Sequence, residues 1–581
     1  MRFATPGTTG IPARSIGLII VFGVSFWWLT LHVDLYSYLP DDGAYAYVAD
    51  RINHGDVLNR DIHDVHAGYV HFMNSWALRL FGDSLLSLRY PLLFLTVLQT
   101  LIVFWLSSRQ SLMTGFLCAA VMTGLTFIQF LNPTANWYCL FIVIVLGATL
   151  ERLEIDSFKG ACMAGLLVGI VFFFRQLTGI IVAAAVLVLI LMRISRRHGS
   201  EQRSAVVAFV VPVVLALGFV LFRSNNLGSA VLFGTWPIAV CVSLLLTLRA
   251  PNRKVLERVA QFATGFSISA MPLLAYHAWT GSLTGWWNDT VRAAVQLSGM
   301  KFISGASFVE LPVLSAEGLA REPGIGAALN GLYWTLLILA PAFLGIALIR
   351  RLRARNGESI PPLVWLAMFY ALVSLHYEIP IYLMYGSGLV LAALLLIATP
   401  ARRRSAYPIR LLVCFCLAIG ILYQSARPLS VPLADVLRGS RGDAAVKCDL
   451  ERLGLRVEPH VCKKYQRLVH IVRTRSRPTQ SILALPANPE LYFLGNRRST
   501  LGFYNSAFGV LGQDQERIVE HTLATTPPAL VFFQPSDKYN DRNTSAIMKS
   551  VSRNYDRLAS VGEFEIFARP DRICAVQDGE E

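Results

Sequence analysis

The chain has 581 residues, of which 54% are hydrophobic and only 15% charged, and its formal net charge at pH 7 is +15. Soluble proteins of this size rarely combine so few charges with apolar runs of about 20 residues, the length that matches a bilayer core. The composition therefore excludes an ordinary soluble globular protein. It predicts a polytopic α-helical membrane protein with a polar C-terminal tail.

The first predicted span covers residues 15–33 and follows a short N-terminus that contains Arg2 and Arg14. This pattern imitates a secretory signal peptide, but no small-x-small cleavage site follows it. Trp27 and Trp28 suit an anchor at the membrane interface. We interpret the segment as an uncleaved first helix.

Hydropathy predicts about 13 spans in all. One apolar stretch, 160–195, would be roughly 54 Å long as a single helix, which is too long for a bilayer. We expect it to break at Arg175-Gln176-Leu177-Thr178-Gly179. The spans after the first are 86–106, 112–131, 136–150, 160–174, 178–194, 205–222, 229–247, 257–276, 329–349, 361–376, 381–398 and 408–425.

Four clusters of Arg and Lys predict the orientation in the membrane. With an odd number of spans and a cytoplasmic N-terminus, every cluster falls on the cytoplasmic side, as the positive-inside rule requires. The positive charge is thereby explained by topology, and no nucleic-acid partner is inferred. The clusters are Arg193/Arg196/Arg197/Arg203, Arg249/Arg253/Lys254/Arg258, Arg350/Arg351/Arg353/Arg355 and Arg402/Arg403/Arg404/Arg410.

The same orientation defines two domains of a multi-pass protein of the inner or plasma membrane. Residues 1–425 form a transmembrane domain whose outer loops are 34–85 and 277–328. Residues 426–581 form an extracytoplasmic domain. The glycine-rich loop 277–328 is expected to act as a lid or an acceptor-binding loop, with disorder as the alternative.

The first outer loop is predicted to contain two short helices. Asp41 and Asp42 can cap a helix that continues to about Asn53, and an amphipathic helix follows from about Gly68 to Phe81. Amphipathic helices with aromatic residues lie in the plane of the membrane interface. This places the two carboxylates at headgroup depth, which suits a substrate with a lipid tail and a polar head.

The tail reads as a small α/β domain of three layers. Its sequence has no glycine-rich nucleotide-binding motif, so no nucleotide is inferred. A Cys448–Cys462 disulfide is one of two open alternatives, and it would leave Cys574 unpaired. The predicted helices are 463–476, 514–524 and 544–554, and the predicted strands are 481–485, 491–494, 528–533 and 564–568.

Asp41 and Asp42 are the first candidates for chemistry. Adjacent carboxylates at a partly desolvated interface repel each other, so one can have a raised pKa and serve as a base near neutral pH. The alternative is that both only cap a helix.

The same loop holds several further acidic and histidine side chains. They could bind a phosphate through protonated histidine, or a divalent metal ion, and the alternative is a solvated surface loop. The residues are Asp56, Asp61, His63, Asp64, His66 and His71.

Arg89, Arg175 and Gln176 lie at the ends of predicted spans. An arginine at such a depth usually faces a cavity or a partner, and its geometry suits a phosphate; snorkelling to headgroups is the alternative. Tyr377 and Glu378 lie in a very short outer connection. They could contact the acceptor or simply form a turn.

Several of these segments resemble the GT-C superfamily of membrane glycosyltransferases, which use polyprenyl-phosphate sugars. Within it, the chain is most similar to protein O-mannosyltransferases and the lipid A aminoarabinose-transferase group. The matching segments, in the family's order, are Asp41-Asp42-Gly43-Ala44-Tyr45, Asp64-Val65-His66-Ala67-Gly68-Tyr69, Phe81-Gly82-Asp83-Ser84, Leu88-Arg89-Tyr90-Pro91, Gly169 through Arg175-Gln176-Leu177-Thr178-Gly179, and His376-Tyr377.

The resemblance implies an inverting transfer of a sugar to an envelope acceptor on the outer face. Asp41 would be the general base, and Asp42 would orient a substrate. Arg89, Arg175 or His66 would stabilise the leaving phosphate, with Asp64, Gln176, Tyr377 and Glu378 as further substrate-binding residues. The partners would be the lipid-linked sugar, membrane lipids and the acceptor.

Two departures from the family pattern stand out. Ala67-Gly68 replaces Pro-Pro, and the loop 132–137 lacks an acidic pair, which disfavours a metal requirement; no cofactor is expected. The rival hypotheses are a transporter or flippase of lipid-linked saccharides and a non-catalytic envelope scaffold.

Overall fold

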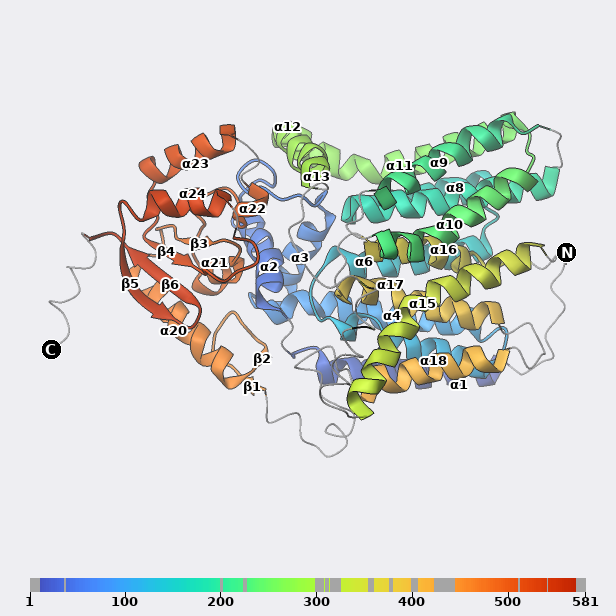
Figure 1. Ribbon diagram of the computed structural model, residues 1–581, viewed down its shortest axis with the longest axis horizontal. Coiled ribbons are helices and arrows are strands. Elements are labelled where there is room, and N and C mark those ends of the chain that lie inside the picture. The colour runs from blue at the N-terminus through green and yellow to red at the C-terminus, as the bar shows by residue number, and fades with distance from the viewer. Residues whose placement is uncertain are drawn as a thin grey trace.

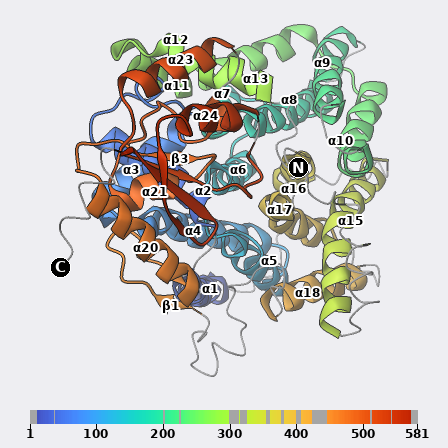
Figure 2. The same cartoon turned by 60° about the vertical axis from the view of Figure 1, so that its left-hand side comes forward.

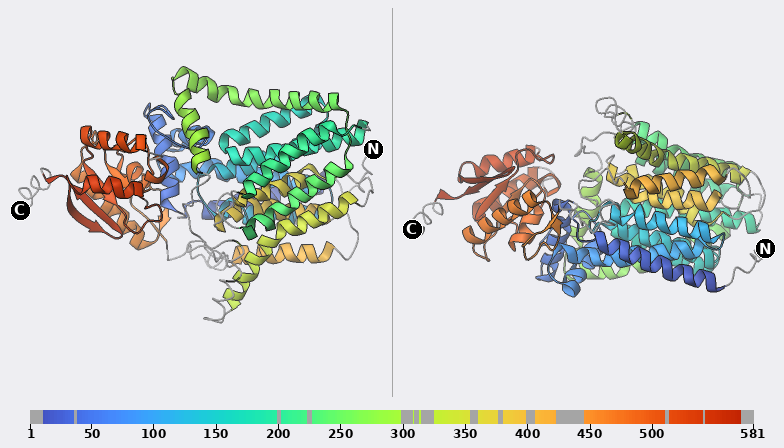
Figure 3. Two further views of the ribbon diagram at one scale, coloured as in Figure 1. Left: turned by 45° about the horizontal axis from the view of Figure 1, so that its top comes forward. Right: turned by 90° about the horizontal axis from the view of Figure 1, so that it is seen from below.

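The computed structural model describes most of the chain as a long helical bundle with an α/β domain at one end (Figure 1). The C-terminal domain and the beginning of the first helix, α1 (Ile11–His32), lie at opposite ends of the molecule, as the right-hand view of Figure 3 shows. The described residues are 11–35, 38–198, 202–222, 227–297, 308, 313, 325–353, 360–375, 380–398, 406–422, 445–509, 513–540 and 542–570. The predicted domain boundary at 425 lies outside them.

The predicted spans are confirmed one for one as apolar helices. Nine helices of the described residues are long and apolar enough to cross a membrane, and four shorter ones, at 158–174, 204–219, 362–375 and 408–419, fill the remaining predicted places. The protein is therefore a multi-pass helical membrane protein. The helices are α1 (Ile11–His32), α4 (Tyr90–Ser107), α5 (Leu112–Gly124), α6 (Ala135–Arg152), α7 (Phe158–Phe174), α8 (Gln176–His198), α9 (Ser204–Phe222), α10 (Leu227–Thr247), α11 (Asn252–Trp279), α15 (Ile325–Arg353), α16 (Pro362–Tyr370), α17 (Pro380–Ala398) and α18 (Ala406–Leu422).

The predicted break after α7 is also present. Arg175 has an extended backbone, with φ −155° and ψ 111°, and separates α7 from α8. The two helices then pack against each other as an antiparallel pair. Both ends that meet at Arg175 lie on the side of the C-terminal domain, because Gln176 at the start of α8 donates a hydrogen bond to Val65 O of the first loop at 3.0 Å.

The basic ends of the helices meet at the opposite end of the bundle. Arg197 near the end of α8 pairs with Glu154 and Asp156 at 2.7 Å. The Arg249 N–H donates to Ser195 Oγ at 3.2 Å, so the ends of α8 and α10 are neighbours. Arg197 and Arg249, from the first two basic clusters, thus lie at the end of the bundle away from the C-terminal domain. That this end is cytoplasmic stays a prediction.

The first loop folds into two short helices, as predicted. These are α2 (Leu39–Asn53) and α3 (Tyr69–Phe81), and the short 3-10 helix η1 (Leu85–Arg89) joins α3 to α4. Trp76 and Leu80 of α3 are exposed, which suits a position at a membrane interface. The second loop is described to residue 297 and forms α12 (Leu283–Trp287), the π-helical turn η3 (Asn288–Arg292) and α13 (Ala293–Leu297).

The C-terminal domain has the predicted three layers. Its four-stranded sheet has the order β3-β4-β6-β5, with β3 parallel to β4 and the other neighbours antiparallel. One face packs on α20, and the other on α23 and α24 (Figures 1 and 2). The elements are β1 (Val446–Lys447), β2 (Arg456–Val457), α20 (Pro459–Arg475), β3 (Leu483–Leu485), α21 (Pro489–Gly495), α22 (Ser506–Gly509), α23 (Gln513–Thr525), β4 (Leu530–Phe533), α24 (Arg542–Val551), β5 (Asp556–Val561) and β6 (Phe564–Ala568).

One predicted strand of this domain is wrong. Residues 491–494 belong to the helix α21, which begins with Pro489 at a position where proline favours a helix start. The run Leu491-Tyr492-Phe493-Leu494 is buried on all sides, so its apolar pattern has no period that would separate a helix from a strand. The strand β5 was not predicted.

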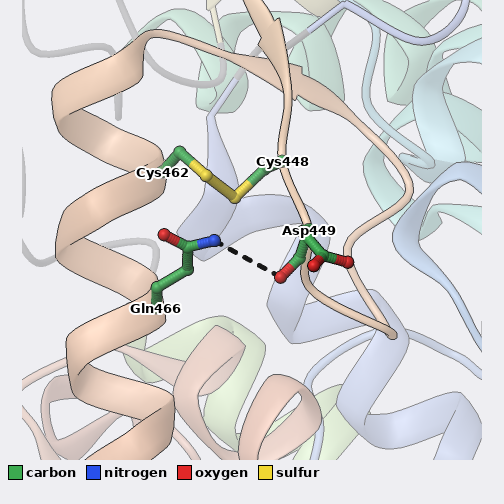
Figure 4. Close-up of a disulfide and its surroundings, with 4 residues drawn as sticks. All are labelled: Cys448, Asp449, Cys462 and Gln466. Atoms are coloured by element: carbon green, nitrogen blue, oxygen red, sulfur yellow. Dashed lines mark hydrogen bonds between the residues drawn. A yellow bond between two sulfur atoms is a disulfide. The ribbon is translucent and has the colours of Figure 1, made fainter.

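Cys448 and Cys462 form a disulfide between the loop after β1 and the first turn of α20 (Figure 4). Beside it, Gln466 Nε2 donates to Asp449 O at 3.4 Å. This decides between the two alternatives that the sequence leaves open. Cys574 lies outside the described residues.

The first loop and the C-terminal domain share one hydrophobic core. Buried residues of α2, including Leu39, Ala46 and Val48, belong to the same cluster as residues of α20, α21 and the sheet. At the closest approach, a Cβ on Gly43 would lie 2.4 Å from Glu490 Cα. Glycine at this position lets α2 and α21 pack backbone to backbone, as their adjacent places in Figures 1 and 2 show.

Substitution of Gly43 by alanine is expected to destabilise this junction by about 1–3 kcal/mol, the usual cost of overpacking a tight contact. The measurement is thermal unfolding of the detergent-solubilised protein. Gly23→Ala is the matched control, because a Cβ on Gly23 in α1 meets no atom within 4 Å. Both changes gain the same helix propensity. Equal midpoints for the two variants would contradict the packing described here.

Candidate active site

The candidate site lies where α2 meets the end of the helical bundle. Asp41 and Asp42 are both in the first turn of α2. Successive residues of a helix point about 100° apart, so the two carboxylates face different surroundings. Asp42 is completely buried, whereas Asp41 is only partly buried.

Asp42 forms an ion pair with Arg89 at the start of α4. Arg89 has no exposed surface, and its Nη2 donates to Asp42 Oδ2. Its Nη1 donates to Val33 O at 3.1 Å and also to Leu35 O, both just after α1. Burial raises the pKa of Asp42 to about 6, and Arg89 limits the rise. The pair therefore joins α1, α2 and α4 at one point.

Asp41 faces a different direction, toward the segment between η2 (Phe127–Gln129) and α6. Burial raises the pKa of its carboxyl to about 6, against the lowering effects of the Lys538 charge, a hydrogen bond from the Asn132 side chain and the charge of His66. A carboxyl with this pKa is mostly ionised at neutral pH and remains basic enough to take up a proton.

A run of polar side chains connects the surroundings of Asp41 to Arg175. Tyr45, one turn after Asp41, lies with its hydroxyl 3.1 Å from Thr134 Oγ1. Asn136 Nδ2 donates to the same Thr134 Oγ1 at 3.1 Å. The Arg175 guanidinium in turn donates to Asn136 Oδ1. Together with Asn132, these side chains form a polar segment between the start of α2 and the end of α7.

Arg175 is a buried cation with no carboxylate partner among the described residues. Only 8% of it is exposed, and its guanidinium lies 5.1 Å from the ring centroid of Tyr382 in α17. No described salt bridge includes it. A buried guanidinium without a counter-ion is costly, so the position favours an anionic ligand.

Asp64 is the centre of a second network beside Asp41. Its Oδ1 lies 2.7 Å from His66 Nδ1 and 2.9 Å from His71 Nε2, and Tyr504 of the C-terminal domain donates to its Oδ2 at 2.5 Å. Burial alone raises the pKa of Asp64, but the charges of His71 and His66 overcome this and hold it well below the usual value. Asp64 is therefore a fixed anion that orients His66, whose Nε2 lies 3.4 Å from the Tyr45 hydroxyl.

The same three residues are a group that could hold a divalent cation, since their ligand atoms lie within 4.8 Å of one another. Both carboxylate oxygens of Asp64 already accept bonds from protein donors. Hydrogen bonds and opposite charges within the network therefore explain why Asp64, His66 and His71 lie close together.

Gln176 and His63 tie the second loop to the first. Gln176 Nε2 donates to Val65 O and, at 3.2 Å, to Thr290 O in η3. His63 Nδ1 lies 2.9 Å from Asp289 Oδ2. A hydrogen bond with Asp289 raises the pKa of His63. Both loops thus meet beside the site, as expected if the second loop covers it.

Most of the site residues predicted from the sequence come together here. Asp41 and Asp64 both interact with His66, and Arg175 and Gln176 are linked to the same part of the structure through Asn136 and Val65. Asp42 and Arg89 lie behind it as a buried pair, and Tyr377 and Glu378 are outside the described residues.

The sequence-based selection missed several residues that the fold adds. Three of these residues, Asn132, Thr134 and Asn136, belong to the run Asn132-Pro133-Thr134-Ala135-Asn136. Polar residues in this number at the start of an apolar span are a signal that could have identified them. Tyr45, Tyr382, Tyr504 and Lys538 reach the site only through the fold, so no local pattern would have found them.

No protein-family model matches the chain, and no curated protein sequence does either. Among solved structures, the chain resembles ArnT from Cupriavidus metallidurans bound to undecaprenyl phosphate, at 12% identity and a TM-score of 0.39, over 98% of this chain and 99% of that one. It also resembles the oligosaccharyltransferase of Archaeoglobus fulgidus in the apo form, at 12% identity and a TM-score of 0.42, over 96% of this chain and 74% of that one.

A second structure from Archaeoglobus fulgidus, the oligosaccharyltransferase AglB in complex with an inhibitory peptide and a dolichol-phosphate, aligns at 12% identity and a TM-score of 0.44 over the same shares of the two chains. The three alignments extend over nearly the whole of this chain. With TM-scores below 0.5, they carry no conclusion about chemistry, which rests on the residues described above.

Arg89→Leu is expected to destabilise the protein by about 3–5 kcal/mol, because it leaves the Asp42 carboxylate buried without its partner. Replacing both residues with leucine should recover part of this loss. Chemical unfolding in detergent provides the measurement. Asp61→Asn, which breaks the exposed pair with Arg60, is the control and should cost under about 1 kcal/mol. A loss no larger than the control's would show that the pair is not structural.

Asp41→Asn is expected to fold and to be at least as stable as the wild type at pH 7–8. The pKa of Asp41 is about 6 in the folded protein and 3.8 in an unstructured chain. The wild type therefore loses stability as pH rises from about 4 to 6, where only the folded state holds the proton. Above pH 6 the wild type carries a desolvated carboxylate that the variant lacks.

The measurement is the thermal midpoint of both proteins from pH 4 to pH 8. The difference between them should grow with pH and level off above about pH 6. A constant difference across this range would mean that Asp41 does not titrate with a raised pKa.

Proposed function

We propose that the protein is an inverting glycosyltransferase that moves a sugar from a polyprenyl-phosphate donor to an envelope acceptor on the outer face of the membrane. One observation carries the proposal. A carboxylate with a pKa near 6 and a buried arginine that has no counter-ion among the described residues are joined by one polar segment, at the end of a membrane bundle. A base and an anion site at this depth suit a reaction on a lipid-linked phosphate.

In the proposed reaction, Asp41 accepts the proton of an acceptor hydroxyl as its oxygen attacks C1 of the sugar. The bond from C1 to the phosphate oxygen breaks, and its electron pair stays on the phosphate. A single displacement of this kind inverts the configuration at C1. The leaving phosphate gains negative charge, which the Arg175 guanidinium would stabilise.

The position of Arg175 supports a donor that carries a lipid tail. It lies between the apolar helices α7 and α8, at their end nearest the C-terminal domain. A phosphate bound there would leave its polyprenyl chain among apolar helices. The exposed Trp76 and Leu80 of α3 would mark the membrane interface at the same level.

The other predicted residues have supporting parts in this proposal. Asp64 would hold His66 toward the substrate, and Gln176 would keep the second loop in place. Asp42 and Arg89 would set the direction of Asp41, because Arg89 is already occupied by Asp42 and two carbonyl groups.

The test uses purified protein in proteoliposomes, a panel of polyprenyl-phosphate sugars and envelope extract as the acceptor. Mass spectrometry follows release of polyprenyl phosphate and incorporation of sugar. Asp41→Asn should lower the rate by about 10²–10⁴-fold, the usual contribution of a general base. Wild-type activity should rise with pH through about 6, where Asp41 loses its proton.

Asp83→Asn is the matched control, because Asp83 is an exposed carboxylate of the same loop. It should transfer sugar at the wild-type rate. Full transfer by Asp41→Asn would refute the mechanism. Movement of the donor between leaflets without any transfer would instead favour a transporter of lipid-linked saccharides.

A further inference from the structure

The turn that follows β4 in the C-terminal domain carries a lysine, Lys538, to the start of α2. This turn, 534–540, is held by its own hydrogen bonds. Asn540 Nδ2 donates to Gln534 O at 2.8 Å and to Pro535 O at 2.6 Å, and the Tyr539 N–H donates to Asp537 Oδ1 at 2.7 Å. The backbone around Lys538 is therefore pinned rather than left as a free loop tip.

Two aromatic rings fix the direction of the Lys538 side chain. Its Nζ lies 5.3 Å from the ring centroid of Tyr38 and 5.2 Å from that of Tyr539. Tyr38 is the N-cap residue of α2, and its carbonyl accepts a hydrogen bond from the Asp42 N–H at 3.2 Å. The ammonium group thus stands at the first turn of α2, where Asp41 lies.

A cation at this place is unfavourable by itself. The N-terminus of a helix carries a partial positive charge and repels a lysine. No described salt bridge includes Lys538, so no carboxylate within ion-pair distance compensates for the repulsion. Two carboxylates interact with its charge, that of the adjacent Asp537 and that of Asp41, and in both the lysine opposes the rise in pKa that burial causes. Of the two, Asp41 lies in the first turn of α2.

A second residue of the same domain reaches the site independently. The Tyr504 hydroxyl donates to Asp64, and Asp64 in turn holds His66 next to Tyr45. The backbone supports this contact, because the His63 N–H donates to Gly502 O at 2.7 Å. Two separate segments of the C-terminal domain thus each place a side chain, Tyr504 or Lys538, beside the carboxylates of the first loop.

From this placement we propose that the C-terminal domain completes the active site, with Lys538 as a positioning residue that keeps Asp41 ionised and aligned for proton transfer. This rests on the proposed function, in which Asp41 is the base. The domain would then belong to the catalytic machinery and would not be a separate appendage. Its docking onto α2 would keep a larger fraction of the base ionised at neutral pH.

Other groups around Asp41 bear on its titration. The charges of Lys538 and His66 and a hydrogen bond from Asn132 lower its pKa, whereas the other interacting groups are acidic or phenolic and do not supply a positive charge. The groups whose charges interact with Asp41 are Lys538, His66, Asp42, Tyr45, Tyr382, Tyr385 and Tyr504. Among these, Lys538 is the one permanent cation at neutral pH, so its removal has the clearest predicted sign.

The test compares Lys538→Gln, Lys538→Arg and Lys549→Gln in the full-length protein. Lys549 is an exposed lysine of α24 in the same domain and serves as the matched control. In Lys538→Gln, the rising limb of the kcat/KM profile should move by about one unit toward higher pH, as expected for loss of a nearby opposite charge. Lys538→Arg and Lys549→Gln should keep the wild-type profile.

A second readout does not depend on sugar transfer. Dicyclohexylcarbodiimide reacts with the protonated form of a buried carboxyl, so its attachment to Asp41, located by peptide mass spectrometry, reports the protonation of that group. The midpoint pH of labelling should lie near 6 in the wild type and rise in Lys538→Gln, but not in Lys538→Arg.

The two readouts separate the two hypotheses. If the wild type transfers no sugar, the proposed function fails, and the labelling midpoint alone decides whether Lys538 acts on Asp41. A labelling midpoint that is the same in Lys538→Gln and the wild type would overturn the role of Lys538, even if transfer is observed. If Tyr504→Phe has the wild-type labelling midpoint, then Lys538, and not Tyr504, is the residue of the C-terminal domain that affects the protonation of Asp41.

Discussion

The structure depends on the burial of one ion pair, Asp42–Arg89, at the point where three helices meet. The pair is shielded from water, and Arg89 also satisfies two carbonyl groups that follow α1. A buried ion pair of this kind adds little net stability, but breaking it is costly, so it fixes geometry. The pair thereby sets the direction of the neighbouring Asp41. One step along the helix turns this side chain by about 100°, toward the polar segment before α6.

A second constraint is that the candidate site is not contained in the membrane bundle. The helices supply the buried Arg175 and the polar segment that ends at Asn136. The first loop supplies Asp41 and the Asp64 network. The C-terminal domain shares a hydrophobic core with that loop and adds Tyr504 and Lys538. Because these groups come from three parts of the chain, they come together only when the C-terminal domain packs on the first loop.

The sequence was sufficient for elements whose signal is local. Apolar runs located the apolar helices of the described residues, and the break at Arg175 followed from the bilayer thickness. Apolar spacing located the two helices of the first loop, but the predicted caps were wrong, because Tyr38 and not Asp41 or Asp42 is the N-cap residue of α2. The strand predicted at 491–494 was wrong, because a fully buried apolar run has no periodicity that separates a strand from a helix. The strand β5 was not predicted. Asp42 and Arg89 looked like separate site residues because nothing local shows that they pair.

By itself, the sequence determined that this is a multi-pass helical membrane protein with an α/β tail and a carboxylate pair beside the first span. These features follow from hydropathy, turn chemistry and residue type, which are properties of short segments. Only the tertiary structure decided that Asp42 is the carboxylate held in an ion pair and that Asp41 is the one that faces the candidate site. It also brought Asn132 and Lys538 to the same carboxylate from distant parts of the chain. Burial and pairing set the pKa and role of a charged group, and both exist only after the chain has folded.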